Sequence, residues 1–119
     1  MIDFYEFSVE RQIKSIQKLA AFVLTRYEIS EEVDITLLAH RENTVFRVDE
    51  LISGRRFVLR VHRAGYHSDD AIRSELAWMT ALKEAGVPTP EVIVSKNGDG
   101  IQVVGHEEVP EPRHVMIHS

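Results

Sequence analysis

Two stretches of the chain repeat apolar residues at the three- and four-residue spacing of a helix. The first runs from residue 8 to residue 27 and predicts an amphipathic helix of about five turns. Ser8 is placed to cap its N-terminus. The expected apolar face consists of Val9, Ile13, Ile16, Ala20, Val23 and Tyr27. We expect this face to pack against a sheet.

The second helical pattern opens at Ser68, which is followed by two acidic residues in the first turn. Its apolar face is expected to contain Ile72, Leu76, Met79 and Leu82. Trp78 lies next to this stripe and is predicted to be a core residue. Gly86 is suited to the C-terminal cap, and Pro88 and Pro90 prevent the helix from continuing.

Outside the helices the pattern changes to short runs rich in Val, Ile, Leu and Phe, which is typical of strands. The predicted strands are residues 35–39, 44–51, 56–62, 91–95 and 101–104, and residues 114–118 alternate weakly. Residues 97–100 (Asn-Gly-Asp-Gly) predict a hairpin turn between the fourth and fifth strands. Residues 105–108 and 110–112 are expected to be loops.

The order of these elements is helix, three strands, helix, and then two or three strands. Hairpin connections dominate, so we predict an α+β fold with a mainly antiparallel five-stranded sheet. The long N-terminal helix spans residues 8–27, and the sheet and second helix span residues 33–119. A chain of 119 residues has room for one such domain, residues 1–119.

Composition and charge exclude several classes of protein. Hydrophobic residues make up 44% and charged residues 28%, an ordinary globular mixture. The net charge of −5 argues against a nucleic-acid partner, and the lack of cysteine excludes disulfides and thiolate chemistry. No apolar run approaches the roughly 20 residues of a membrane span, and the N-terminus does not resemble a signal peptide. We therefore expect a cytoplasmic protein.

The six histidines do not form a convincing metal-binding pattern. His62 and His67 are five residues apart, and His114 and His118 are four apart at the end of the chain. We interpret them as surface or incidental residues, and His62 as half-buried in a strand. The adjacent acids Asp69-Asp70 are expected to stabilise the start of the second helix, not to form a catalytic pair.

Arg60 and Glu75 are the residues that most strongly suggest chemistry. Glu75 is expected on or beside the buried stripe of the second helix, where a carboxylate is costly unless a cation meets it. Arg60 lies in an apolar strand just upstream and is the candidate cation. The pair either stabilises the fold, in which case breaking it costs about 3–5 kcal/mol, or positions the arginine for another role.

The order of elements around this pair resembles that of the protein-kinase-like N-terminal lobe, in which a strand cation holds nucleotide phosphates. Within that superfamily the chain resembles the aminoglycoside phosphotransferase, choline kinase and homoserine kinase group. The resemblance covers residues 35–119 and is carried by residues 40–48, residues 57–61, and residues 75–82 with the Gly-Val-Pro-Thr-Pro turn at 86–90. It implies ATP and Mg²⁺ as cofactors and phosphoryl transfer to a substrate hydroxyl.

The resemblance also implies roles for individual residues. Arg60 would contact the α- and β-phosphates, and Glu75 would orient it. The loop over the phosphates would be Arg41, Glu42, Asn43 and Thr44, and the adenine slot would contain Leu38, Val45 and Val58. The chain departs from the family at two places, because the family more often has lysine at the position of Arg60 and because this loop contains no glycine.

The sequence contains no His-x-Asp segment with an Asn five residues after the Asp, which in this family supplies the catalytic groups. We therefore expect that the C-terminal catalytic lobe is absent, that this chain alone is inactive, and that it binds ATP weakly. Substrate recognition would lie in that lobe, and the exposed lobe interface could self-associate. The alternative is a stand-alone α+β binding or interaction module, in which Arg60 and Glu75 form a purely structural ion pair.

Overall fold

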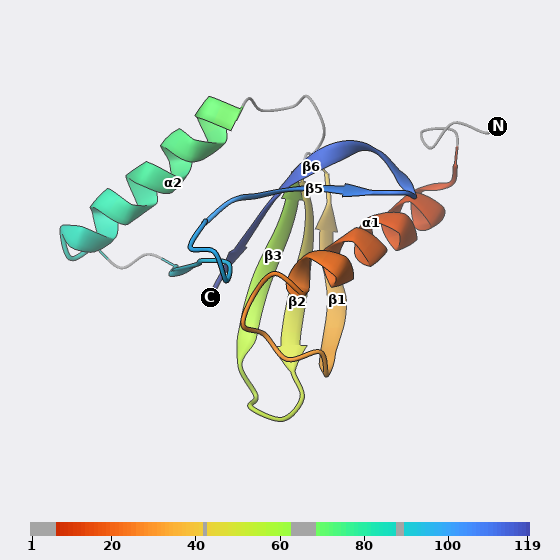
Figure 1. Ribbon diagram of the computed structural model, residues 1–119, viewed down its shortest axis with the longest axis horizontal. Coiled ribbons are helices and arrows are strands. Elements are labelled where there is room, and N and C mark those ends of the chain that lie inside the picture. Colours follow the sequence, from red (N-terminus) through yellow and green to blue (C-terminus); the bar gives the residue numbers. More distant parts are fainter. Residues whose placement is uncertain (1–6, 42, 63–68, 88–89) are drawn as a thin grey trace.

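The computed structural model in Figure 1 describes residues 7–41, 43–62, 69–87 and 90–119, with the backbone alone for residues 69–71 and 110. Its elements are α1 (Val9–Leu24), β1 (Val33–His40), β2 (Asn43–Glu50), β3 (Arg56–His62), α2 (Asp69–Glu84), β4 (Val92–Ile93), β5 (Gln102–His106) and β6 (Val109–His118). The predicted α+β fold is confirmed. The described sheet has six strands, one more than expected, and its strand pairs are antiparallel.

Helix α1 begins where the sequence predicts. The Ser8 side chain accepts a hydrogen bond from the backbone N–H of Arg11 at 3.2 Å, which confirms the cap. The helix ends at Leu24, because the backbone N–H groups that follow donate to carbonyls three residues back and tighten the last turn. For example, the N–H of Tyr27 donates to the carbonyl of Leu24. Val9 is 59% exposed, so its expected place on the buried face is wrong.

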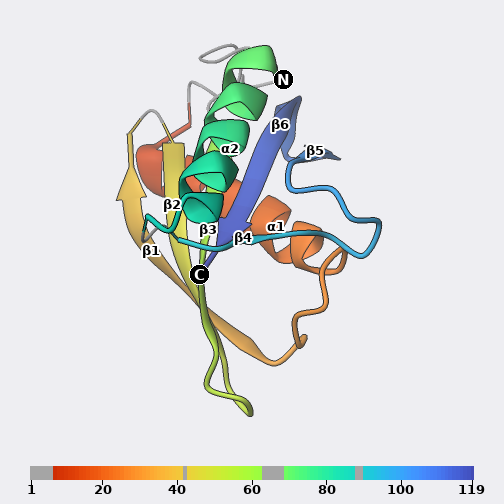
Figure 2. The same cartoon turned by 90° about the vertical axis from the view of Figure 1, so that its left-hand side faces the viewer.

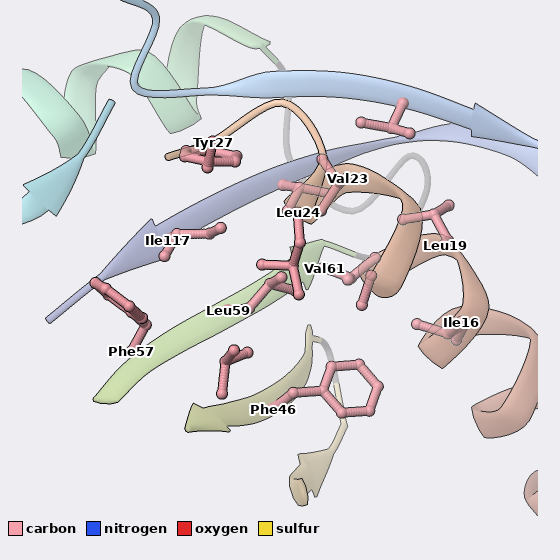
Figure 3. Close-up of a cluster of buried hydrophobic side chains, with 14 of the residues drawn as sticks. Ile16, Leu19, Val23, Leu24, Tyr27, Phe46, Phe57, Leu59, Val61 and Ile117 are labelled. Carbon is pink, nitrogen blue, oxygen red and sulfur yellow. The ribbon is translucent and has the colours of Figure 1, made fainter. Parts of the chain in front are cut away.

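The hydrophobic core lies between α1 and one face of the sheet (Figure 3). Alternate residues of the central strands enter it, as the two-residue period of a strand requires. The largest fully buried members are Leu19, Val23, Tyr27, Phe46, Val48, Leu59, Val61, Val104 and Ile117. One face of the sheet is thereby closed by α1, and the other face is left for different contacts.

Strand β6 occupies the middle of the sheet, although the sequence indicated only a weak last strand. The strand order is β1-β2-β3-β6-β4, and β5 pairs with β6 as well. The C-terminal half of β6 bonds β3 and β4, whereas residues 109–115 bond β5. The prediction of a loop at residues 110–112 is therefore wrong. Pro110 and Pro112 are tolerated in β6 because, among the described residues, β3 pairs only with residues 115–118 of this strand.

The predicted hairpin across residues 97–100 is also wrong. β4 contains only two residues and pairs with β6, not with β5. Within the turn, the backbone N–H of Gly98 donates to the carbonyl of Ser95, and Gly98 takes a φ of +86°. The true hairpin joins β5 to β6 through Glu107 and Glu108, in the stretch expected to be a loop. The local turn signal was correct, but it does not decide which strands pair.

Helix α2 extends away from the sheet, as Figure 1 shows, and contacts it sparsely. Ile72 is buried and Leu76 packs against Gly100, but Trp78 is 65% exposed, so the prediction that it is a core residue is wrong. The predicted cap is confirmed: Gly86 has a φ of +83°, and the N–H of Val87 donates to the carbonyl of Leu82. The predicted start at Ser68 lies outside the described residues. Neither described helix is long and apolar enough to span a membrane.

The turn between β2 and β3 provides a test of local backbone geometry. Gly54 has a φ of +74°, and a Cβ there would meet no atom within 4 Å. Gly54→Ala should destabilise the fold by about 1 kcal/mol, because only the left-handed backbone conformation is penalised. Urea unfolding would measure this. Gly105→Ala is the control, since Gly105 has equal space without a positive φ; equal losses for both variants would contradict the prediction.

Candidate functional site

The face of the sheet opposite α1 carries four of the nine site residues singled out from the sequence, namely Asn43, Val45, Val58 and Arg60. The register places Val45, Arg60 and Met116 side by side across β2, β3 and β6. The next row across the same strands is Arg47, Val58 and His118. Residues of these strands that point to α1 alternate with them, so both rows share the opposite face. The structure thus brings Val45, Val58 and Arg60 together.

Arg60 lies half-buried in the middle of this face. Its Nε atom is buried and has no hydrogen-bond partner among the described residues, and the same holds for Oδ1 of Asn43 on the neighbouring strand. A buried polar atom without a partner typically costs about 1–3 kcal/mol. Such atoms are rare in folded proteins, and a bound water, ion or ligand is one way in which they are satisfied. The face therefore offers an unused donor on Arg60 and an unused acceptor on Asn43, which begins β2.

Glu75 does not meet Arg60. Its side chain is exposed on α2, contrary to the expected position on the buried stripe, and the described residues include no ion pair between the two. The physical reason is the placement of α2, which makes few contacts with the strands and leaves most of its described residues exposed to solvent. Helical spacing placed Glu75 next to apolar residues, but it could not show how little of α2 is covered.

Removing Glu75 should therefore have little effect on stability. We expect Glu75→Ala to change the free energy of unfolding by less than about 0.5 kcal/mol, as at an ordinary surface position. Glu84→Ala, exposed on the same helix, is the matched control. A loss of about 3 kcal/mol for Glu75→Ala but not for the control would contradict this prediction and support a structural ion pair between Glu75 and Arg60.

The predicted phosphate loop is the turn between β1 and β2. Arg41 is exposed and its backbone N–H donates to the carbonyl of Asn43, whereas Glu42 lies outside the described residues. The side chain of Thr44 is buried on the α1 side of β2, away from Arg60, and its hydroxyl is 2.8 Å from Nδ1 of His40. Asn43 lies two residues before Val45 on β2, so its side chain is on the face of Arg60.

His40 is part of the base of this loop. Burial lowers the pKa of its imidazole, and the nearby positive charge of Arg113 lowers that pKa further. The ring is therefore neutral near pH 7, so it can exchange a hydrogen bond with Thr44 without adding charge to the loop. This contact ties the end of β1 to the start of β2.

The proposed adenine slot is only partly assembled. Val45 and Val58 are half-buried neighbours on the face of Arg60. Leu38 lies at a bulge where the pairing of β1 with β2 shifts between Leu37 and Ala39, and it is 52% exposed. A bulge changes the direction of the side chain relative to the regular strand. The sequence alternation alone did not reveal this.

The other arginines of the face are already paired. Asp49 accepts hydrogen bonds from Nε of Arg56 at 2.8 Å and from Nε of Arg47 at 2.9 Å. The bond from Arg56 is the largest cause of a lowered pKa for the Asp49 carboxyl. Arg47 and Arg56 thus have a carboxylate partner on the sheet, whereas Nε of Arg60 has no such partner among the described residues.

Sequence reasoning missed two residues of this face, Met116 and His118. Both are buried on β6 beside Arg60 and Val58. Their alternation in residues 114–118 was visible in the sequence, but the central position of β6 was not. Within the described ranges, no three His, Cys, Asp or Glu side chains gather as a metal-binding cluster.

Comparison with known proteins identifies relatives of this arrangement. The sequence profile of the family described as "Phosphotransferase enzyme family" matches residues 34–111. A solved structure of the microcompartment-associated aminopropanol kinase is 33% identical over 86% of this chain, with a TM-score of 0.75. The amicoumacin kinase hAmiN in complex with AMP-PNP, Ca²⁺ and Ami is 18% identical over 92% of the chain, with a TM-score of 0.74, which concerns the fold alone.

The chain spans 30% of the aminopropanol kinase and 33% of the amicoumacin kinase. Among curated proteins, none matches the sequence significantly.

Proposed function

Because the chain belongs to the phosphotransferase enzyme family, we propose that it forms the ATP-binding part of a small-molecule kinase. The kinase would transfer the γ-phosphate of ATP to a hydroxyl group of a small substrate. The groups that complete the chemistry would come from sequence outside these 119 residues, since the chain has no His-x-Asp-x-x-x-x-Asn segment. On its own, the chain would not catalyse the reaction.

One observation carries this proposal: the half-buried Arg60, whose Nε atom has no hydrogen-bond partner among the described residues. A guanidinium can donate two parallel hydrogen bonds to phosphate oxygens, and charge-assisted bonds of this kind are about twice as strong as neutral ones. Asn43, with its own unpartnered oxygen, lies on the same face. ATP phosphates lying across β2 and β3 would satisfy Arg60.

Apolar residues on the same face support a place for the adenine ring. Val58 is two residues from Arg60 on β3, and Val45 is opposite Arg60 on β2. Together with Leu38 from the edge of the sheet, they would form one side of the slot. His118, at the end of β6, lies opposite Val58 and would border the slot on the β6 side.

A divalent metal is proposed to arrive with the phosphates of ATP. The described residues offer no metal-binding cluster, so they would hold Mg²⁺ only through the nucleotide. The metal would neutralise the negative charge that develops on the transferred phosphoryl group. The role of this chain would be to position the phosphates, chiefly through Arg60, with Glu75 orienting the arginine only if α2 moves toward the sheet.

The relative with 33% identity, a kinase of aminopropanol, supports a proposal for the substrate class. We propose that the complete protein phosphorylates the hydroxyl of a small amino alcohol. Such a substrate would be recognised outside this chain, so this part of the proposal rests on the relative and not on a pocket in the sheet.

Titration of the chain with Mg-ATP, followed by NMR chemical shifts, tests the proposal. We expect a dissociation constant of about 1 mM, because a single lobe supplies only part of the contacts. Shifts should concentrate on β2, β3 and the end of β6, and Mg-AMP should cause smaller shifts because it lacks the β- and γ-phosphates. Shifts scattered over the surface, or equal effects of AMP and ATP, would contradict the assigned site.

A further inference from the structure

Strand β1 forms an open margin of the sheet. It pairs with β2 on one side, and no described residue pairs with its other side. Figure 2 shows β1 at the outside of the sheet with no strand beyond it. An unpaired row of backbone N–H and C=O groups is a template for another strand. With eight residues, β1 is much longer than β4, the two-residue strand at the opposite end of the sheet order.

The usual protection against such pairing is weak here. Natural edge strands are commonly blocked by lysine, proline, inward-pointing charges or a bulge. Between Val33 and His40 the strand contains neither lysine nor proline, and Asp34 is its one acidic residue. A bulge is present, but it lies near the C-terminal end, between Leu37 and Ala39. Residues 33–37 remain a regular five-residue segment.

This regular segment carries an apolar row that the chain itself covers incompletely. Val33 and Ile35 pack against the core yet remain only partly buried, and Leu37, next in the same row, is 40% exposed. The three residues lie on the α1 side of the sheet, because their partners on β2 are Glu50, Val48 and Phe46. The core therefore continues to the margin of the sheet, where its cover is incomplete.

We propose that β1 pairs antiparallel with β1 of a second copy of this chain, with the two-fold axis at Ile35. In this register Ile35 lies opposite its own copy, and Val33 lies opposite Leu37. Asp34 lies opposite Thr36, so no like charges face each other. Side chains on each face remain matched, because residues equally distant from the axis point to the same side.

The occupant is a second copy because the segment is complementary to itself. A two-fold interface uses the same patch on both subunits, and this patch joins an apolar row to an apolar row. The pairing ends before the bulge, which accounts for why it would be short. The interface differs from the face that holds Arg60, so dimerisation and nucleotide binding are separable.

Sedimentation velocity over a concentration series tests the proposal. From about 10 µM to about 1 mM, the wild-type mass should rise from monomer toward dimer, since a small interface gives a dissociation constant on the order of 100 µM. Leu37→Lys should raise that constant about tenfold or more, because it places a charge in the pairing row. Val103→Lys, which introduces lysine at a half-exposed apolar position on β5, should leave it unchanged.

A second measurement does not depend on the lysine variants. The chain has no cysteine, so a single introduced thiol reports one contact. Directly opposite residues of an antiparallel pair have Cα atoms about 4.5–5.5 Å apart, within the range of a disulfide. Ile35→Cys should form a disulfide-linked dimer under mild oxidation much faster than Val103→Cys. Equal rates, a wild type that stays monomeric, or a dimer insensitive to Leu37→Lys would overturn the proposal.

Discussion

Substituting Arg60 by alanine should weaken Mg-ATP binding by about 10- to 100-fold. A hydrogen bond to a charged group contributes about 1.5–3 kcal/mol, and each 1.4 kcal/mol corresponds to a factor of ten in affinity. The loss should be large because Asp49 already engages the arginines at positions 47 and 56, so they are not free to replace Arg60. NMR or calorimetric titration with Mg-ATP measures the change.

Two further variants make this prediction specific. Arg56→Ala removes a cation from the same strand and the same face, but from its exposed end, and should leave ATP affinity nearly unchanged. Arg60→Lys keeps the charge and should restore part of the affinity, because lysine binds phosphate as a point charge. If the Arg60→Ala variant binds ATP as well as the wild-type protein does, the phosphate role assigned to Arg60 is wrong, whatever the family of the chain.

Removing Glu50 should cause the second large effect, a loss of about 2–3 kcal/mol in the free energy of unfolding. The Glu50 side chain is only 4% exposed and accepts hydrogen bonds from Nε of Arg55, from the backbone N–H of Ser30 and from the hydroxyl of Ser53. It thereby joins the connection after α1 to the turn between β2 and β3. Glu50→Ala leaves all three donors without their acceptor.

The same hydrogen bonds to Glu50 make the free energy of unfolding depend on pH. The hydrogen bond from Arg55, followed by that from the Ser30 N–H, lowers the pKa of Glu50 from 4.5 to about 2. A depressed folded-state pKa contributes stability above the unfolded-state value, and this contribution is lost as pH falls from about 4.5 toward about 2. The loss should be somewhat below the full value of the shift, because Arg55 is 55% exposed and solvent screens part of the interaction.

Urea unfolding between pH 7 and pH 3 separates the contribution of the Glu50 charge to stability from that of its side-chain shape. Glu50→Gln keeps the shape of the side chain without its charge, and should make stability less sensitive to acid than in wild type. Glu84→Gln, exposed on α2, controls for the removal of one carboxylate. If wild type and Glu50→Gln lose the same stability as the pH falls, other carboxylates cause the loss of stability in acid.

Sequence patterns predicted the parts of the candidate site that depend on local spacing. Alternation on β3 correctly placed Val58 and Arg60 on one face, and the pairing of β2 with β3 adds Val45 to it. Glu75 was misplaced because helical spacing identifies an apolar stripe but not how much of it another element covers. Thr44 was expected near phosphate, yet the register directs its side chain toward α1.

The amino-acid sequence by itself determined the two helices, the first three strands and the membership of the phosphotransferase family. The helices and strands depend on interactions between residues near one another in the chain. These are the Ser8 cap, the 3.6-residue and two-residue periods, and the Gly86 C-terminal cap. Tertiary structure alone decided that β6 lies at the centre, between β3 and β4. Strand pairing at long range selects partners through competing hydrogen bonds and shared burial, and a local turn signal such as residues 97–100 carries no information about that competition.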